Sequence, residues 1–170
     1  MLNKFIFVYT VLVIQLALSS TATAAENKAY LSTRVLSTVM AIKAATVAEQ
    51  TCNKMGYQVS VAVVDRYGTL ISFARNPLSG AHTITISQDK AYTAATFQGD
   101  TIELTKRLEF LKGTPRLSLV GGGVPVKIAG YMYGAIGVSG APAKKTPGDV
   151  DHECAMAGVN AVREAIEFGE

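Results

Sequence analysis

One apolar, glycine-rich stretch limits the possible folds more than any other feature of the sequence. It covers residues 119–140, contains seven glycines and carries a single charge, that of Lys127. The pattern predicts two strands, 124–129 and 131–138, joined at Gly130, because glycine in a strand pattern marks a bend, a bulge or a close approach of two backbones. We therefore expect a strongly bent hairpin with a backbone-lined hollow at its glycine-rich end. Such a hollow is a candidate binding site.

The remaining apolar periodicities predict an α+β domain. Helical spacing predicts four helices, at residues 31–55, 82–97, 100–110 and 149–168. Alternation between turn residues predicts further strands at 57–65, 69–75 and 116–120. These strands and the two of the hairpin make about five. Tight turns between consecutive strands favour an antiparallel sheet, and repeated strand–helix–strand crossovers are absent from the pattern.

The first 24 residues have the pattern of a secretory signal peptide. Lys4 lies in a short basic start, residues 5–18 form an apolar run, and Ala22-Thr23-Ala24 fits a cleavage site. The alternative is an uncleaved anchor, for which the run is short. We expect a single mature domain of residues 25–170 that is periplasmic or secreted, with no membrane attachment after cleavage.

Charge and motif spacing argue against several classes of function. Loss of Lys4 changes the net charge from +3 to +2 (3 − 1 = +2), which gives no reason to expect a nucleic acid partner. The triple glycine Gly121-Gly122-Gly123 is not followed by the Lys-Ser/Thr of a phosphate-binding loop. Gly137–Ala141 departs from the spacing of a serine-hydrolase elbow. With two histidines and no C-x-x-C-H, the sequence shows no catalytic constellation and no covalent haem attachment.

Five short motifs, in order, resemble the GlcG/HbpS-like family, which includes the C-terminal domain of PduO. They are Val61–Asp65 with Gly68, Lys90–Ala94, Gly121–Pro125, Gly134–Gly140, and Asp151 ahead of Ala155 and Gly158. The resemblance covers the mature chain and implies a profilin-like fold, with N- and C-terminal helices packed on an antiparallel sheet, and assembly into homo-oligomers. It also implies haem as a possible non-covalent cofactor, since studied members bind haem and some act in extracellular haem-linked redox sensing. Where family members use a histidine in the first helix, this chain has none.

Three side chains are candidate ligands of a haem iron or walls of its pocket. His82, at the entry to the second helix, is a possible axial ligand, or an ordinary exposed or capping histidine. His152 is a weaker candidate. It and Cys154, two residues later, point in different directions on one helix, so they are a poor pair of ligands for one metal. Tyr131 is a further candidate for the pocket, or a core residue.

Two cations are candidates for binding a ligand carboxylate, such as a haem propionate. Lys90 lies on the second helix, and Arg75 ends the strand that faces the same loop. The alternative for both is a solvated surface side chain. Together with His82, Tyr131 and Gly121-Gly122-Gly123, they form the predicted ligand-binding set.

The two cysteines lie near the end of the first helix and the start of the last. If these helices pack antiparallel on one sheet face, Cys52 and Cys154 meet, and an oxidising compartment favours a disulfide. Two buried thiols and a redox switch are the alternatives.

Three functions remain open on this basis. The first is an exported small-molecule-binding protein, for haem or a related tetrapyrrole, acting in sensing or supply. The second is an enzyme or accessory protein for a small organic acid. The third is an oligomeric structural module without a ligand.

Overall fold

The computed structural model describes residues 29–169, so the predicted signal peptide lies outside the described residues. Contacts divide the chain into two units, residues 1–33 and 34–170. All helices and strands of the described residues belong to the second unit. Within residues 29–169 no helix has the length and apolar character needed to cross a membrane.

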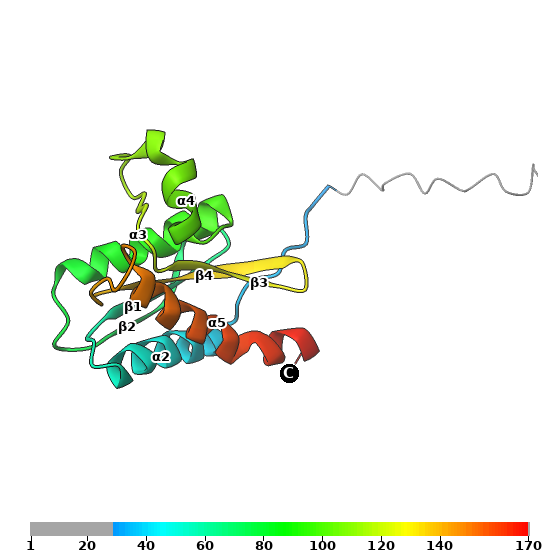
Figure 1. Cartoon of the computed structure of the whole chain (residues 1–170). Helices are drawn as coiled ribbons and strands as arrows, with labels where there is room; N and C mark the ends of the chain where they lie inside the picture. Colours follow the sequence, from blue (N-terminus) through cyan, green and yellow to red (C-terminus); the bar gives the residue numbers. More distant parts are fainter. Residues whose placement is uncertain (1–28, 170) are drawn as a thin grey trace, which may run out of the picture. The chain divides into compact units, whose positions relative to one another are not determined.

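The second unit is an antiparallel four-stranded sheet with helices on both faces (Figure 1). The strand order is β2-β1-β4-β3. The strands are β1 (Ser60–Asp65), β2 (Leu70–Arg75), β3 (Gly123–Ile128) and β4 (Tyr131–Ser139). The helices are α2 (Thr38–Lys54), α3 (His82–Phe97), α4 (Thr101–Arg107) and α5 (Asp149–Phe168), with a short 3₁₀ helix η1 at Glu109–Leu111. The α+β class and the antiparallel sheet are confirmed, with four strands rather than about five.

The predicted strand 116–120 is wrong, because its backbone is bonded to side chains rather than to a neighbouring strand. The N–H of Ser118 donates to Oγ1 of Thr93 on α3, and the carbonyl of Leu119 accepts from Oγ1 of Thr105 on α4. Pairing with β4 begins only at Gly122, whose carbonyl accepts the N–H of Val138. The segment is therefore a connection held by threonines.

The first helix begins seven residues later than the apolar spacing predicts. Ser37 is its N-cap, with a side-chain oxygen that accepts the N–H of Met40. Its inward face is a row of small buried residues, while the larger Val39 and Ile42 are exposed. That row is Ala41, Ala44, Ala45, Ala48 and Cys52.

Small side chains let α2 and α5 cross closely on one face of the sheet. At Gly158 of α5 an added Cβ would lie 2.7 Å from the carbonyl oxygen of Ala44. Cys52 and Cys154 are fully buried at this crossing and form a disulfide with a Cα–Cα distance of 5.6 Å. The expected pairing of the cysteines is confirmed.

A β-bulge in β4 decides which side chains face which helix layer. Val126 pairs with Gly134 and Lys127 with Met132, so that Tyr133 has no partner on β3. After this extra residue the alternation is reversed. Tyr133 and Ile136 therefore both belong to the core under α2 and α5.

Candidate functional site

The backbone of α3 occupies the hollow that the glycine-rich hairpin was expected to leave. An added Cβ at Gly137 would lie 2.0 Å from the carbonyl oxygen of Ser87, and one at Gly123 would lie 2.4 Å from that of Lys90. No side chain fits at these distances, so the glycines serve to seat the helix directly on β3 and β4. The prediction of a ligand hollow beside α3 is wrong for the single subunit.

Lys90 is a buried side chain rather than a solvated one. Its Nζ donates to a carboxylate oxygen of Asp151 at 2.7 Å and to the carbonyl of Val138 at 2.9 Å. The other oxygen of Asp151 accepts the N–H of Ala141. Burial lowers the pKa of Lys90 and raises that of Asp151, while the attraction between the two charges opposes both shifts. The ammonium group is thus held by internal partners that join α3, β4 and α5.

The other predicted ligand side chains, those of His82, Arg75 and Tyr131, are not gathered in one place. His82 and Arg75 are exposed at the N-terminal end of α3, where Arg75 donates to the carbonyl of Ser79. Sixteen residues of helix, roughly 24 Å, separate His82 from the other end of α3. Tyr131 is half-exposed at the start of β4, with the guanidinium of Arg34 3.9 Å from its ring centroid. These side chains do not form one site in the subunit.

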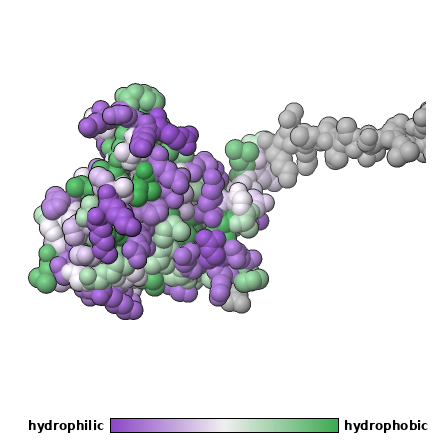
Figure 2. Space-filling view, in the orientation of Figure 1, coloured by the Kyte–Doolittle hydropathy of each residue, from purple (hydrophilic) through white to green (hydrophobic). Residues whose placement is uncertain are grey.

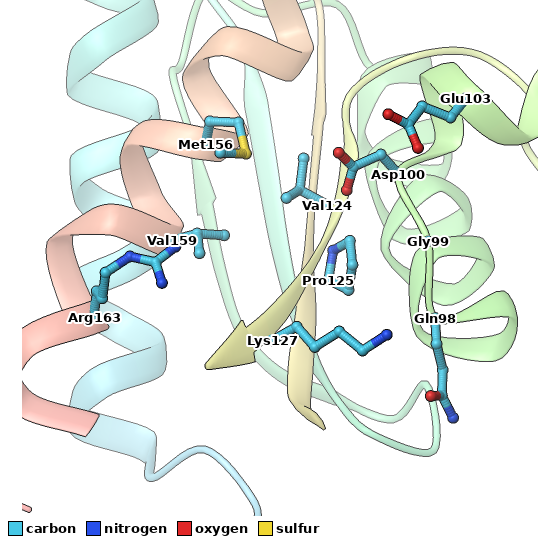
Figure 3. Close-up of a pocket in the computed structure, with 10 residues that line it drawn as sticks. All are labelled: Gln98, Gly99, Asp100, Glu103, Val124, Pro125, Lys127, Met156, Val159 and Arg163. Carbon is cyan, nitrogen blue, oxygen red and sulfur yellow. The ribbon is translucent and has the colours of Figure 1, made fainter. Parts of the chain in front are cut away.

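A groove of about 310 Å³ runs along the edge strand β3 instead (Figure 3). Its floor includes Val124 and Pro125 of β3. Met156, Val159 and Arg163 of α5 form one wall, and the segment 98–103 forms the other. In Figure 3 the side chain of Met156 on the α5 wall points toward that of Val124 on the floor. The groove is therefore an open depression of mixed polarity between the last helix and the α3–α4 junction.

Charges line this groove with opposite signs. Lys127 and Arg163 lie toward one end, and Asp100 and Glu103 toward the other (Figure 3). Burial raises the pKa of Asp100, partly opposed by the neighbouring His152. Among residues 29–169 no three His, Cys, Asp or Glu side chains are placed to hold a metal ion.

His152 stands beside the acidic end, one helical turn before Met156. Its Nε2 is 3.9 Å from a carboxylate oxygen of Asp100. Its Nδ1 is buried and has no hydrogen-bond partner within the described part of the chain. An imidazole and a thioether thus lie at i and i+4 on α5, beside the groove. Of the predicted site residues, His152 contacts the groove residue Asp100, and Gly123 directly precedes the groove floor on β3.

Met156 and Asp100 were not among the predicted site residues. The side chain of Asp100, which directly precedes α4, caps no backbone N–H of that helix. The i, i+4 spacing of His152 and Met156 on an amphipathic helix could have pointed to Met156, but not to Asp100.

The edge of β3 is a poor template for an added strand. Gly123 directs its N–H to Oγ1 of Thr101 at 2.8 Å. Pro125, two residues on along the same edge, has no N–H to offer. The groove is therefore better suited to a small molecule than to an extended peptide.

Comparisons with known proteins agree with this fold. The family model described as haem degrading protein HbpS-like matches residues 36–160. Protein GlcG of Escherichia coli (strain K12) is 34% identical over 110 residues, which cover 62% of this chain and 81% of that protein.

Solved structures give the same result. The crystal structure of HbpS is 36% identical, with a TM-score of 0.73 over 82% of this chain and 99% of that one. A double mutant of HbpS from Streptomyces reticuli is 35% identical, with a TM-score of 0.73 over 85% and 98% of the two chains. The PduOC:heme complex shares the fold, with a TM-score of 0.65 and 23% identity over 75% and 94%. The chain belongs to the HbpS-like family.

Proposed function

We propose that this protein binds haem or a related tetrapyrrole in the groove along β3, and that it does so outside the cytoplasm, in sensing or supply. The observation that carries the proposal is the groove of mixed polarity with a thioether in its wall and an imidazole beside its acidic end. Membership of a family described as haem degrading supports this ligand class. The solved PduOC:heme complex supports it only through the shared fold.

The donor set of the groove fits such a ligand. Either His152 or Met156 would supply an iron ligand, since an imidazole and a thioether are both established haem ligands; both lie on one face of α5, so they would not ligate the iron together. Lys127 and Arg163 would bind the two carboxylates of a tetrapyrrole by charge-assisted hydrogen bonds. The acids at the opposite end would repel those carboxylates and so fix which way round the ligand lies. Bound haem would supply an iron centre that changes oxidation state.

The size of the groove indicates that it covers only part of the ligand. Its volume of about 310 Å³ is at the lower end of the range of about 300–1,000 Å³ for small-molecule sites. A second subunit would cover the exposed side of a tetrapyrrole. We therefore propose that full affinity requires a homo-oligomer.

Export of the protein is a part of this proposal. The buried disulfide between α2 and α5 supports an oxidising compartment. Fractionation of host cells with an antibody tests it, with the mature chain starting near residue 25 expected outside the cytoplasm. Recovery of full-length chain with the cytoplasm would contradict it.

Titration of the purified mature protein with hemin tests the binding. We expect a saturable shift of the Soret band. We expect one of Met156→Ala and His152→Ala to alter the spectrum, and Arg163→Glu to weaken binding by about tenfold without altering it. His82→Ala is the comparison variant, since iron ligation by His82 remains a prediction: a changed spectrum there, with unchanged spectra for the α5 variants, would move the site to the other end of α3.

A second outcome would favour another ligand. If hemin binds weakly and without saturation, while a small organic acid binds and Arg163→Glu abolishes that binding, then the groove is a carboxylate site and the tetrapyrrole proposal is wrong. If neither class binds to the oligomer, the structural-module hypothesis replaces both.

A further inference from the structure

The helix α3 ends on a left-handed residue that is not glycine. Gln98 has φ 50° and ψ 38°, a conformation that is unfavourable for a residue with a Cβ and accessible to glycine. After the other two long helices this conformation belongs to glycines, Gly56 with φ 88° and Gly169 with φ 73°. In α3 the glycine comes one residue later, at Gly99, where the backbone is not left-handed. The end of the helix therefore explains the conformation but not the choice of glutamine.

The side chain of Gln98 lies at the end of the groove along β3 where Lys127 and Arg163 also lie. All three residues line the groove. In Figure 3 the side chain of Lys127 extends across the floor toward Gln98, while Arg163 lies on the opposite wall. This end of the groove thus has a hydrogen-bond donor from each of three elements. They are a guanidinium from α5, an ammonium from β3 and an amide from the end of α3.

Gln98 and Lys127 have no internal use for these donors. Both side chains are exposed, and neither makes a hydrogen bond or an ion pair with another residue of the described chain. Exposure by itself indicates no function, since hydrophilic residues cover much of the face seen in Figure 2. The left-handed backbone distinguishes Gln98 from such surface residues. Unfavourable backbone conformations concentrate where a side chain takes part in binding.

We propose that Gln98 is a specificity-determining residue of the groove, whose side-chain amide donates to a carboxylate of the ligand. The inference rests on the proposed function, because it assigns a contact to one of the two carboxylates of a tetrapyrrole. A carboxylate has two oxygens, so one can accept from the amide of Gln98 and the other from the ammonium of Lys127. Arg163 is then left for the second carboxylate.

This assignment gives opposite effects on stability and on binding for a single substitution. Gln98→Gly removes the amide and places glycine at the left-handed position. We expect the urea midpoint to rise by roughly 0.3–0.5 M, because the strained backbone is relieved. We expect the affinity for hemin to fall by about tenfold, the effect of one lost hydrogen bond to a charged group.

Ala129→Gly is the matched control. Ala129 also has a left-handed backbone, with φ 48°, but it does not line the groove. Its replacement by glycine should raise the urea midpoint in the same way and leave the affinity for hemin at the wild-type value. A loss of affinity in this control equal to that in Gln98→Gly would mean that backbone stiffness, not the amide, decides binding, and would overturn the proposal.

Hemin and hemin dimethyl ester are the two probes, titrated into the full mature chain and followed at the Soret band. The ester has no free carboxylate, so the wild type and Gln98→Gly should bind it equally. Gln98→Asn keeps an amide on a shorter side chain and should recover part of the affinity for hemin. Gln98→Glu replaces the donor by an anion and should bind hemin more weakly than Gln98→Gly does. Equal losses for hemin and its ester would indicate a purely structural role and would contradict the proposal.

Failure of this inference differs from failure of the proposed function. A wild-type chain that binds hemin saturably, with Gln98→Gly binding it equally well, refutes only the role of Gln98. A wild-type chain that does not bind hemin saturably refutes the proposed function and the carboxylate contact with it. A lower urea midpoint for Gln98→Gly than for the wild type would mean that glutamine serves stability, and would also overturn the inference.

Discussion

The buried pair of Lys90 and Asp151 gives the sharpest test of how this domain is held together. The two side chains are 2% and 4% exposed, and their charged atoms are 2.7 Å apart. The variant Asp151→Asn keeps an oxygen for the N–H of Ala141 but removes the charge that faces Lys90. Removal of one partner from a buried pair costs about 3–5 kcal/mol, because an uncompensated charge remains inside. We expect Asp151→Asn to lower the free energy of unfolding by about 3 kcal/mol, the lower end of this range, because the amide oxygen can still accept the N–H of Ala141.

Urea unfolding at pH 7 under oxidising conditions measures this loss. With a slope of about 2 kcal/mol/M, a loss of 3 kcal/mol lowers the unfolding midpoint by about 1.5 M. The matched single variant Lys90→Met should cost a similar amount, since it leaves Asp151 buried and unpaired. The double variant should cost about 3–4 kcal/mol rather than the sum of about 6, because the charges are removed together.

Two results would refute the reasoning. Single variants within about 0.5 kcal/mol of the wild type would mean that water reaches the pair and that the side chains are not buried as described. Strict additivity in the double variant would mean that Lys90 and Asp151 act through different partners.

Three further predictions concern other parts of the fold. Replacement of both cysteines of the Cys52–Cys154 disulfide by alanine should lower the free energy of unfolding by up to about 4.7 kcal/mol, the chain-entropy value for a loop of about 100 residues; an unchanged urea midpoint contradicts this. Gly137→Ala should lower the free energy of unfolding by about 1–3 kcal/mol, because the added methyl group overpacks against α3. The control Gly99→Ala, whose added Cβ would have its nearest neighbour 3.4 Å away, should leave the free energy of unfolding nearly unchanged. Equal losses for the two variants would contradict this account of helix packing. Hydrogen bonds from backbone N–H groups, that of Lys144 first, lower the pKa of Asp149 to about 2, so its stabilisation is complete above the unfolded pKa near 3.8 and is lost as the pH falls toward 2. Asp149→Asn should therefore be less stable than the wild type at pH 5 and equal to it near pH 2, and a constant difference would contradict the linkage.

The sequence predicted elements that have a strong local pattern. The hairpin of β1 and β2 and the glycine-rich hairpin of β3 and β4 follow from alternation and turn residues. The last helix follows from its amphipathic spacing. The predicted strand 116–120 failed because threonines on α3 and α4 take up its backbone groups, and such long-range partners leave no local signal.

The candidate site was harder to predict than the fold. A row of glycines in a strand can leave space for a ligand, or it can allow a helix to pack closely against the strand. Only the position of α3 decides between these two interpretations. No local sign in the sequence indicates that Lys90 is buried, because Asp151, the carboxylate that pairs with it, lies 61 residues away along the chain. The groove itself joins β3, α5 and the α3–α4 junction, so no single segment could reveal it.

The disulfide has a consequence for how the domain opens. It ties α2 to α5 on one side of the sheet, while α3 on the other side is held by close backbone packing and the pair of Lys90 and Asp151. Thermal fluctuations should therefore detach the layers unequally, with α3 released first and the stapled layer last. Amide protons of α3 should exchange with deuterium sooner than those of α2. The sheet would then have one helix layer that is covalently linked and one that can separate from it while the rest stays folded.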